Sequence, residues 1–154
     1  MVKIGLGYDL HRLVYGKPLV LGGVNIESSF GSEAHSDGDA FIHALVDSIL
    51  SPLGAPDIGV LFPDSDEAAK GMNSLDILKK IKDKYLAGST IINIDGVVIL
   101  DNPKIAAHIP EIKKILSEAL GIPAGRIGIK GKTSEHTRPF TVECHVVTLL
   151  DTSI

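Results

Sequence analysis

A dense set of chemically active side chains lies at residues 34–43. This stretch reads Ala-His-Ser-Asp-Gly-Asp-Ala-Phe-Ile-His, so two histidines, two aspartates and a serine surround one glycine. Histidine and aspartate move protons and bind divalent metals, and serine bonds phosphates or caps helices. The second half continues as an apolar pattern with helical spacing. A helix that begins at such a cluster predicts a binding or catalytic site at its start.

Asp9 and His11 form a second group of metal-binding types. Residues two apart in a strand point to the same side, so both side chains can reach one ion. His43 lies beside the apolar stripe of the helix. With Asp9 and His11 it supplies three ligands and leaves a fourth position free, the pattern of an open zinc site. The alternative is that His11 is a surface residue and His43 a hydrogen-bonded, half-buried one.

Three further stretches carry polar residues at spacings that could bind phosphate, a polyol or a metal ion. His35 and Ser36 precede the helix, where backbone N–H groups favour an anion such as phosphate; alternatively Ser36 is the N-cap and His35 a loop residue. In residues 57–66, aspartates lie on both sides of Phe62. Their carboxylates could bond the hydroxyls of a polyol, with the Phe62 ring closing over that ligand. Alternatively, these aspartates are ordinary solvated charges of a loop. Residues 130–135 could hold phosphates and, through Glu135, magnesium, or form an ordinary polar strand exit.

Other motifs are weaker. Residues 102–105 could present backbone groups to a base edge. The single cysteine, Cys144, lies in a strand-like run, which favours a core position over a nucleophile. It cannot form an intrachain disulfide or a thiolate cage, so any metal must rest on histidine and carboxylate. The sequence shows neither a glycine-rich phosphate loop nor a Ser-His-Asp order.

Composition narrows the class of protein. The 154 residues suit a single domain, residues 1–154, and 44% hydrophobic with 22% charged residues is ordinary for a globular protein. A net charge of −4 argues against a nucleic-acid partner. No apolar run approaches the roughly 18 residues of a membrane span, and the N-terminus leads directly into a strand-like pattern. We therefore expect a cytoplasmic protein with no membrane partner.

The elements that must position these residues follow from periodicity and turn signals. Strands are predicted at 3–8, 90–100, 127–132 and 142–150, and a hairpin at 19–21 and 24–26 around Gly22-Gly23. Residues 28–31 read as a polar turn and 57–71 as a long loop. Helices are predicted from Ser36 or Asp37 to about Leu53, at 75–86, and at 111–120. The order predicts an α/β (α+β) sandwich: a mixed four-stranded sheet plus the hairpin, with helices on one face. The uncovered face needs a partner, and we expect oligomerisation through it.

Together these stretches resemble the 2-C-methyl-D-erythritol 2,4-cyclodiphosphate synthases of the non-mevalonate isoprenoid pathway. The resemblance runs in order through six blocks: G-Y-D-L-H (7–11), 34–43, D-I-G-V-L-F-P-D-S-D (57–66), N-P-K-I (102–105), H-I-P (108–110) and K-T-S-E (132–135). It implies a homotrimeric lyase with active sites between subunits. In the implied reaction the 2-phosphate of 4-diphosphocytidyl-2-C-methyl-D-erythritol 2-phosphate attacks its own β-phosphorus, which closes a ring and expels CMP.

The resemblance also implies residue roles. Asp9, His11 and His43 are the zinc ligands, one Zn²⁺ per chain, and Glu135 is the ligand of a Mg²⁺ or Mn²⁺ ion. His35 and Thr133 stabilise the transition state. The substrate-binding residues are Asp9, Leu10, His11, His35, Ser36, Asp57, Ile58, Gly59, Phe62, Pro63, Asp64, Ser65, Asp66, Lys132, Thr133, Ser134 and Glu135. The cytidine pocket is Leu100, Asp101, Asn102, Pro103, Lys104, Ile105 and Ala106.

The chain departs from the family pattern at residues 136–141. Many members carry a longer, glycine-rich segment there, near the trimer axis, which has been linked to isoprenoid diphosphates. Two rival functions use the same residues: a metal-dependent phosphodiesterase with water as nucleophile, and a trimeric nucleotide-binding module without catalysis.

Overall fold

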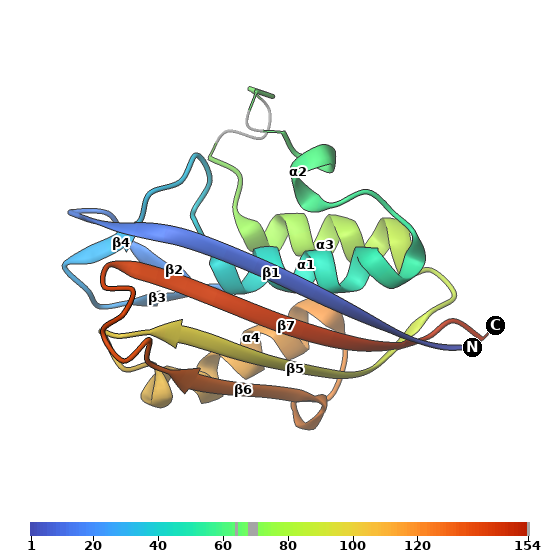
Figure 1. Cartoon of the computed structure of the whole chain (residues 1–154). Helices are drawn as coiled ribbons and strands as arrows, with labels where there is room; N and C mark the ends of the chain where they lie inside the picture. The colour runs from blue at the N-terminus through green and yellow to red at the C-terminus, as the bar shows by residue number, and fades with distance from the viewer. Residues whose placement is uncertain (64, 68–70, 154) are drawn as a thin grey trace.

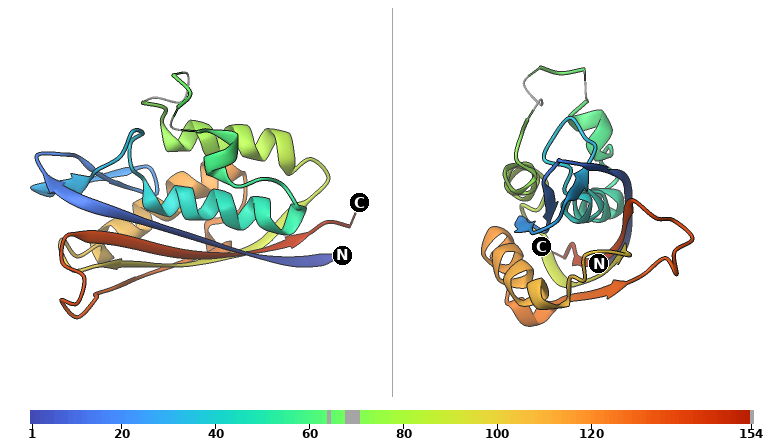
Figure 2. Two further views of the ribbon diagram at one scale, coloured as in Figure 1. Left: turned by 45° about the horizontal axis from the view of Figure 1, so that its top comes forward. Right: turned by 90° about the vertical axis from the view of Figure 1, so that its left-hand side faces the viewer.

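The computed structural model describes residues 1–63, 65–67 and 71–153. In this part of the chain a five-stranded mixed sheet carries its helices on one side (Figures 1 and 2). The strand order is β4-β1-β7-β5-β6, with β5 and β6 parallel and the other pairs antiparallel. The strands are β1 (Val2–Tyr15), β2 (Leu19–Leu21), β3 (Val24–Ile26), β4 (Phe30–Ser32), β5 (Thr90–Leu100), β6 (Ile127–Lys132) and β7 (Thr141–Asp151).

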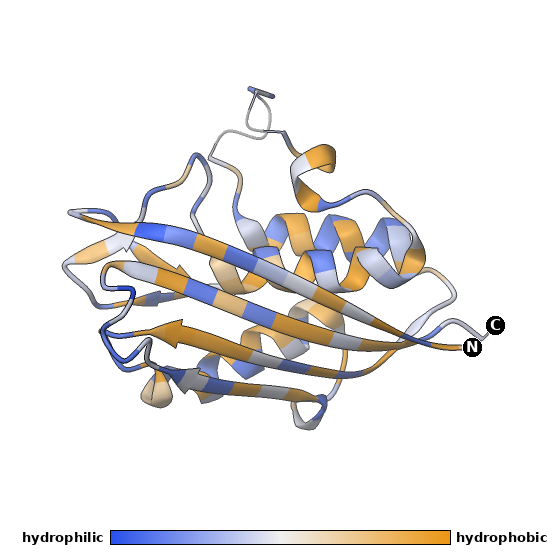
Figure 3. Cartoon of the chain, in the orientation of Figure 1, coloured by the Kyte–Doolittle hydropathy of each residue, from blue (hydrophilic) through white to orange (hydrophobic). Residues whose placement is uncertain are grey.

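The helices are α1 (Ala40–Leu50), α2 (Ile58–Leu61), α3 (Ser74–Tyr85) and α4 (Ile109–Leu120), with short 3-10 turns η1 (Ser51–Leu53), η2 (Ala106–His108) and η3 (Ala124–Arg126). Helix α1 packs on β1 and β7, α4 on β6, and α3 on both α1 and α4. The helices show alternating hydrophobic and hydrophilic residues in Figure 3, as the periodicity predicted. No helix among the described residues is long and apolar enough to cross a membrane.

The predicted mixed sheet, hairpin and one-sided helices are confirmed, but the end of the first strand and the role of residues 28–31 were wrong. Strand β1 does not end at Asp9; it continues to Tyr15 because residues 2–12 pair with β7 and residues 13–15 pair with β4. The stretch 28–31 is not only a turn, since Phe30–Ser32 pairs with the extended end of β1 and makes a fifth strand. Serine and glycine disfavour strands, but the ladder to β1 outweighs that local preference.

The hairpin turn follows its sequence closely. Gly22 and Gly23 join β2 to β3 with φ of 59° and 80°. Positive φ at both positions is the requirement of a type I′ turn, which glycine meets without steric cost.

The core lies between the sheet and the helices. Phe41, Leu45 and Ile49 of α1 are fully buried, and α3 contributes Leu78 and Ile81. Cys144 is also fully buried, which confirms its core position, and burial raises the pKa of its thiol well above the ordinary value. On the outer face of β1, by contrast, Ile4, Leu6, Tyr8 and Leu10 are exposed.

Candidate metal and phosphate site

Strand β1 and helix α1 position the metal-binding types. Gly7 lets the two backbones meet: a Cβ on it would come within 1.7 Å of the Ala44 carbonyl oxygen. This close approach sets His43 of α1 above Asp9 and His11 of β1. Asp9 and His11 project from the helix-facing side of the strand, as their spacing of two predicted.

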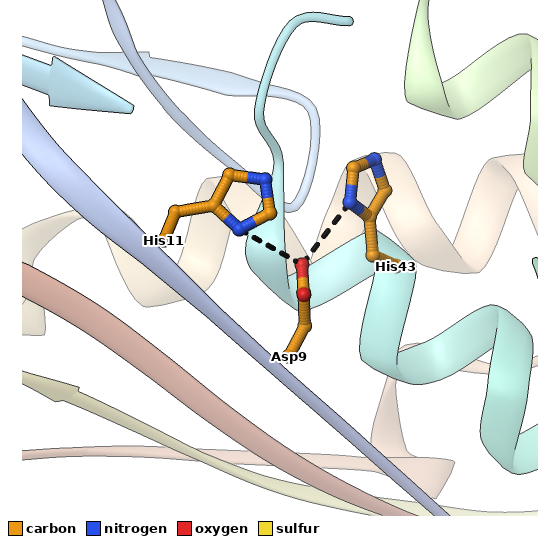
Figure 4. A group of neighbouring side chains, drawn as sticks. All are labelled: Asp9, His11 and His43. Atoms are coloured by element: carbon orange, nitrogen blue, oxygen red, sulfur yellow. Dashed lines mark hydrogen bonds and ion pairs between the residues drawn. The ribbon is translucent and has the colours of Figure 1, made fainter. Parts of the chain in front are cut away.

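The three side chains converge on one point (Figure 4). One ligand atom from each lies within 4.8 Å of the others. Asp9 Oδ2 is 3.1 Å from His43 Nδ1 and 3.2 Å from His11 Nδ1. The second of these contacts lacks hydrogen-bond geometry, so the buried His11 Nδ1 has no hydrogen-bond partner among the described residues.

An imidazole nitrogen left without a partner beside a carboxylate oxygen fits a bound cation. Buried polar atoms are normally paired, and a cation between the nitrogen and the oxygen would satisfy both. The electrostatics agree. Burial works to lower the pKa of His43, but the hydrogen bond and charge of Asp9 outweigh it and raise that pKa above its ordinary value. The site therefore favours positive charge at this point, whether a proton or a metal ion.

These three residues open into a pocket of about 330 Å³. Its wall includes both residues predicted to face the substrate phosphate, His35 and Ser36, together with three residues of the predicted polyol loop. The full lining is Asp9, His11, Glu33, Ala34, His35, Ser36, His43, Ile58, Gly59, Phe62 and Ile77. Glu33 and Ile77 had no distinguishing signal in the sequence.

The cap of α1 differs from the prediction. Asp39, not Ser36 or Asp37, is the N-cap, and its carboxylate accepts the N–H groups of Ile42, Gly22 and Gly23 at 3.0, 2.9 and 2.7 Å. All three residues could cap, but only Asp39 also reaches the hairpin turn. Burial raises its pKa to about 6 despite these bonds. Ser36 is thereby left beside the pocket.

The stretch 57–66 contains the short helix α2 rather than loop alone. Asp57 caps it by accepting the Val60 N–H at 3.0 Å, and Asp47 of α1 accepts the Ile58 N–H at 2.8 Å. These bonds turn Ile58, Gly59 and Phe62 to the pocket. Asp66 donates its N–H to the Pro63 carbonyl, Ser65 is exposed, and Asp64 lies outside the described residues. Leu10 is exposed on the opposite face of β1 from Asp9.

A second pocket, of about 280 Å³, gathers other predicted site residues. Its lining is Val98, Leu100, Lys104, Ile105, Ala106, Gly131, Lys132, Thr133 and Glu135. Thr133 donates its hydroxyl to Glu135 at 3.0 Å. The Asp101 carboxylate accepts the Ser134 N–H and hydroxyl. Desolvation works to raise the pKa of Asp101, but these hydrogen bonds outweigh it and lower that pKa. Asn102-Pro103 is a cis peptide at the turn.

The two pockets share no lining residue. The first lies beside β1 and the second beside β5 and β6, with β7 between these strands in the sheet. Within one chain, the structure therefore does not bring Glu135 and Thr133 together with the Asp9, His11 and His43 group.

The segment after Glu135 is strained. Glu135, His136 and Phe140 have φ of 53°, 59° and 58°, a region that non-glycine residues seldom adopt. The predicted departure from the family pattern at 136–141 thus falls on a tight connection without glycine. Arg138 from this connection pairs with Glu143 at 2.6 Å.

Comparison with known proteins identifies the family of this chain. A sequence model of the YgbB family matches residues 2–151. Curated proteins named 2-C-methyl-D-erythritol 2,4-cyclodiphosphate synthase are similar, among them those of Clostridium acetobutylicum (49% identity, 87% of each chain) and Aquifex aeolicus (48%, covering 87% of this chain and 86% of the relative). The chain belongs to this synthase family.

A solved structure of a synthase of the family agrees in fold. It is described as 2C-methyl-D-erythritol-2,4-cyclodiphosphate synthase in a bound form with CDP. It shares 43% identity, with a TM-score of 0.92 over 97% of this chain and 100% of the other. The expected family, fold and enzyme class are therefore confirmed, and the role in isoprenoid precursor synthesis follows from the family name.

Proposed function

We propose that this chain converts 4-diphosphocytidyl-2-C-methyl-D-erythritol 2-phosphate into 2-C-methyl-D-erythritol 2,4-cyclodiphosphate, releases CMP, and does so with Asp9, His11 and His43 holding Zn²⁺. The observation that supports the metal is the unpaired His11 Nδ1 beside Asp9 Oδ2. Family membership supports the reaction. One Zn²⁺ per chain and a Mg²⁺ or Mn²⁺ ion at Glu135 are part of the proposal.

The reaction needs positioning more than a protein nucleophile. Nucleophile and electrophile belong to one substrate, so holding it folded supplies proximity worth up to about 7–11 kcal/mol. Bound cations would offset the charge of the diphosphate and of the incoming phosphate. This is why a site without a catalytic triad suffices.

The chain's own residues hold the two ends of the substrate. In the first pocket, Ser36 and the 57–66 segment, including Pro63, Asp64, Ser65 and Asp66, hold the erythritol phosphate, with Phe62 over it. His35 borders the reacting phosphates there. The family resemblance assigns Leu10 to substrate binding as well. In the second, Lys132, Thr133, Ser134 and Glu135 hold the diphosphate, and the 100–106 turn holds cytosine. The CDP-bound form of a relative supports a cytidine nucleotide as ligand, and the 100–106 turn is where we propose that it binds.

A homotrimer explains why one chain separates these pockets. If the first pocket of one subunit faces the second pocket of its neighbour, His35 and Thr133 meet across an interface. The exposed row of Ile4, Leu6, Tyr8 and Leu10 supports such burial. Residues 1–154 then act as one domain, and the expected cytoplasmic location stays a prediction.

Product analysis tests the reaction. We expect ³¹P NMR of the incubated substrate to show a cyclic diphosphate appearing together with CMP. A linear product carrying oxygen from water would contradict cyclisation and favour the phosphodiesterase. Tight CMP binding without turnover would favour a binding module.

A further inference from the structure

We propose that Ser74 is a positioning residue for the metal site, which fixes the tautomer of His43 and passes its hydrogen bond on to Asp37. The inference rests on the metal site of the proposed function and goes beyond it, because Ser74 lies outside the first pocket. It comes from α3, 31 positions after His43.

With Asp37 as the acceptor, the hydrogen bonds on the Nε2 side of His43 place a proton on that nitrogen. His43 Nε2 lies 3.1 Å from Ser74 Oγ, and Ser74 Oγ also makes a very short contact with Asp37 Oδ1. An ionised carboxylate only accepts, so the Ser74 hydroxyl proton goes to Asp37. Ser74 Oγ must then accept from His43, which places a proton on Nε2.

This arrangement directs the other ring nitrogen. With Nε2 protonated, the Nδ1 of a neutral His43 carries a lone pair toward Asp9 Oδ2, 3.1 Å away. A lone pair facing an anionic oxygen is unfavourable unless a cation lies between them. Ligand histidines commonly fix their metal-binding nitrogen by donating from the other one, and Ser74 supplies that acceptor here.

The acceptor is itself held rigidly. Ser74 is fully buried, and Asp37 accepts its backbone N–H at 2.9 Å as well as its hydroxyl. Both groups of one residue are therefore fixed by one carboxylate at the start of α3. Ser36 Oγ, at 3.5 Å from His43 Nε2, is too far to replace Ser74 without movement.

Ser74→Ala tests the inference against Ser48→Ala. Ser48 is also fully buried, and its hydroxyl bonds Leu45 O at 2.7 Å and Thr148 Oγ1 at 2.6 Å, away from the metal ligands. The control variant thus also removes a fully buried, hydrogen-bonded serine hydroxyl, but one that does not contact a candidate metal ligand. We expect Ser74→Ala to weaken Zn²⁺ affinity roughly 10–100-fold in competition with a chromogenic chelator, while Ser48→Ala leaves it unchanged.

The Zn²⁺ affinities distinguish a failure of the proposed metal site from a failure of the proposed role of Ser74. If the unaltered protein binds no Zn²⁺, the metal site of the proposed function fails and this inference fails with it. If it binds Zn²⁺ and Ser74→Ala binds equally well, or both variants lose affinity alike, the site stands and Ser74 has no positioning role.

A second measurement needs no variant at position 74. In protein labelled with ¹⁵N-histidine and loaded with Zn²⁺, we expect long-range ¹H–¹⁵N spectra to show the His43 proton on Nε2, assigned by its loss in His43→Gln. A proton on Nδ1 would overturn the inference even if Ser74→Ala did not fold.

Discussion

Asp39 is a buried carboxylate on which opposite effects act. Three backbone N–H groups favour its ionised form, while complete burial favours the protonated one and raises its pKa to about 6. Because the unfolded chain releases this proton near 3.8, the folded state holds more protons between these two values. Stability from this group is therefore largest below the lower value and falls as pH rises to about 6.

Asp39→Asn removes this titration. We expect the stability of the original protein, relative to the variant, to fall by about 3 kcal/mol as pH rises from about 4 to 7, and to level off above that. Urea unfolding of the metal-free proteins across this range measures it. A relative stability that rises with pH would mean that the N–H bonds outweigh burial.

Residue types and spacing predicted the three side chains that the structure brings together as candidate metal ligands, but not the residues around them. The spacing of Asp9 and His11 sufficed to predict that they share a face, and helical periodicity placed His43 beside the core. Nothing local distinguished Asp39 from Ser36 or Asp37 as the cap, since the choice depends on the hairpin turn at Gly22 and Gly23. The contact of Ser74 with His43 joins two helices and has no sequence signal.

Among the elements, the contact between β1 and α1 brings the three candidate metal ligands together. A Cβ at Gly7 would lie 1.7 Å from Ala44 O and 2.8 Å from Ser48 N, both backbone atoms that cannot move alone. Any side chain there must push α1 away from the strand and His43 away from Asp9.

We therefore expect Gly7→Ala to destabilise the protein by at least about 1–3 kcal/mol and to lower metal affinity together with stability. Gly125→Ala is the control, because a Cβ there meets nothing within 4 Å. Chemical denaturation and metal titration of both variants provide the measurement. Equal stability of the two variants would show that α1 does not rest on Gly7.

Element boundaries were predictable where local signals act alone. Strands β5 and β6 begin and end as predicted, and the turn at Gly22-Gly23 follows from its glycines. Strand β1 was predicted too short because residues 10–15 are held by distant partners, β7 and β4. Helix α2 was missed because four residues capped by Asp57 carry no period.

At the scale of the whole molecule, the outer face of β1 is the surface that we propose to lie between subunits. Figure 3 shows hydrophobic residues alternating along this strand, and Ile4 and Leu6 are 69% and 62% exposed. We expect Leu6→Glu to convert a trimer into monomers in light scattering, because it would bury a charge between subunits. Ala87→Glu, at an exposed position after α3, should remain trimeric. A monomeric unaltered protein would contradict the proposed assembly.

We propose that Asp9, His11 and His43 hold a metal ion and that CMP release depends on it. The most direct test measures Zn²⁺ content and CMP release on the same preparation, for the unaltered protein and for His43→Ala. We predict about one Zn²⁺ per chain with CMP release in the first, and loss of both in the second. Full CMP release from metal-free protein would show that the reaction does not depend on a metal at these three residues.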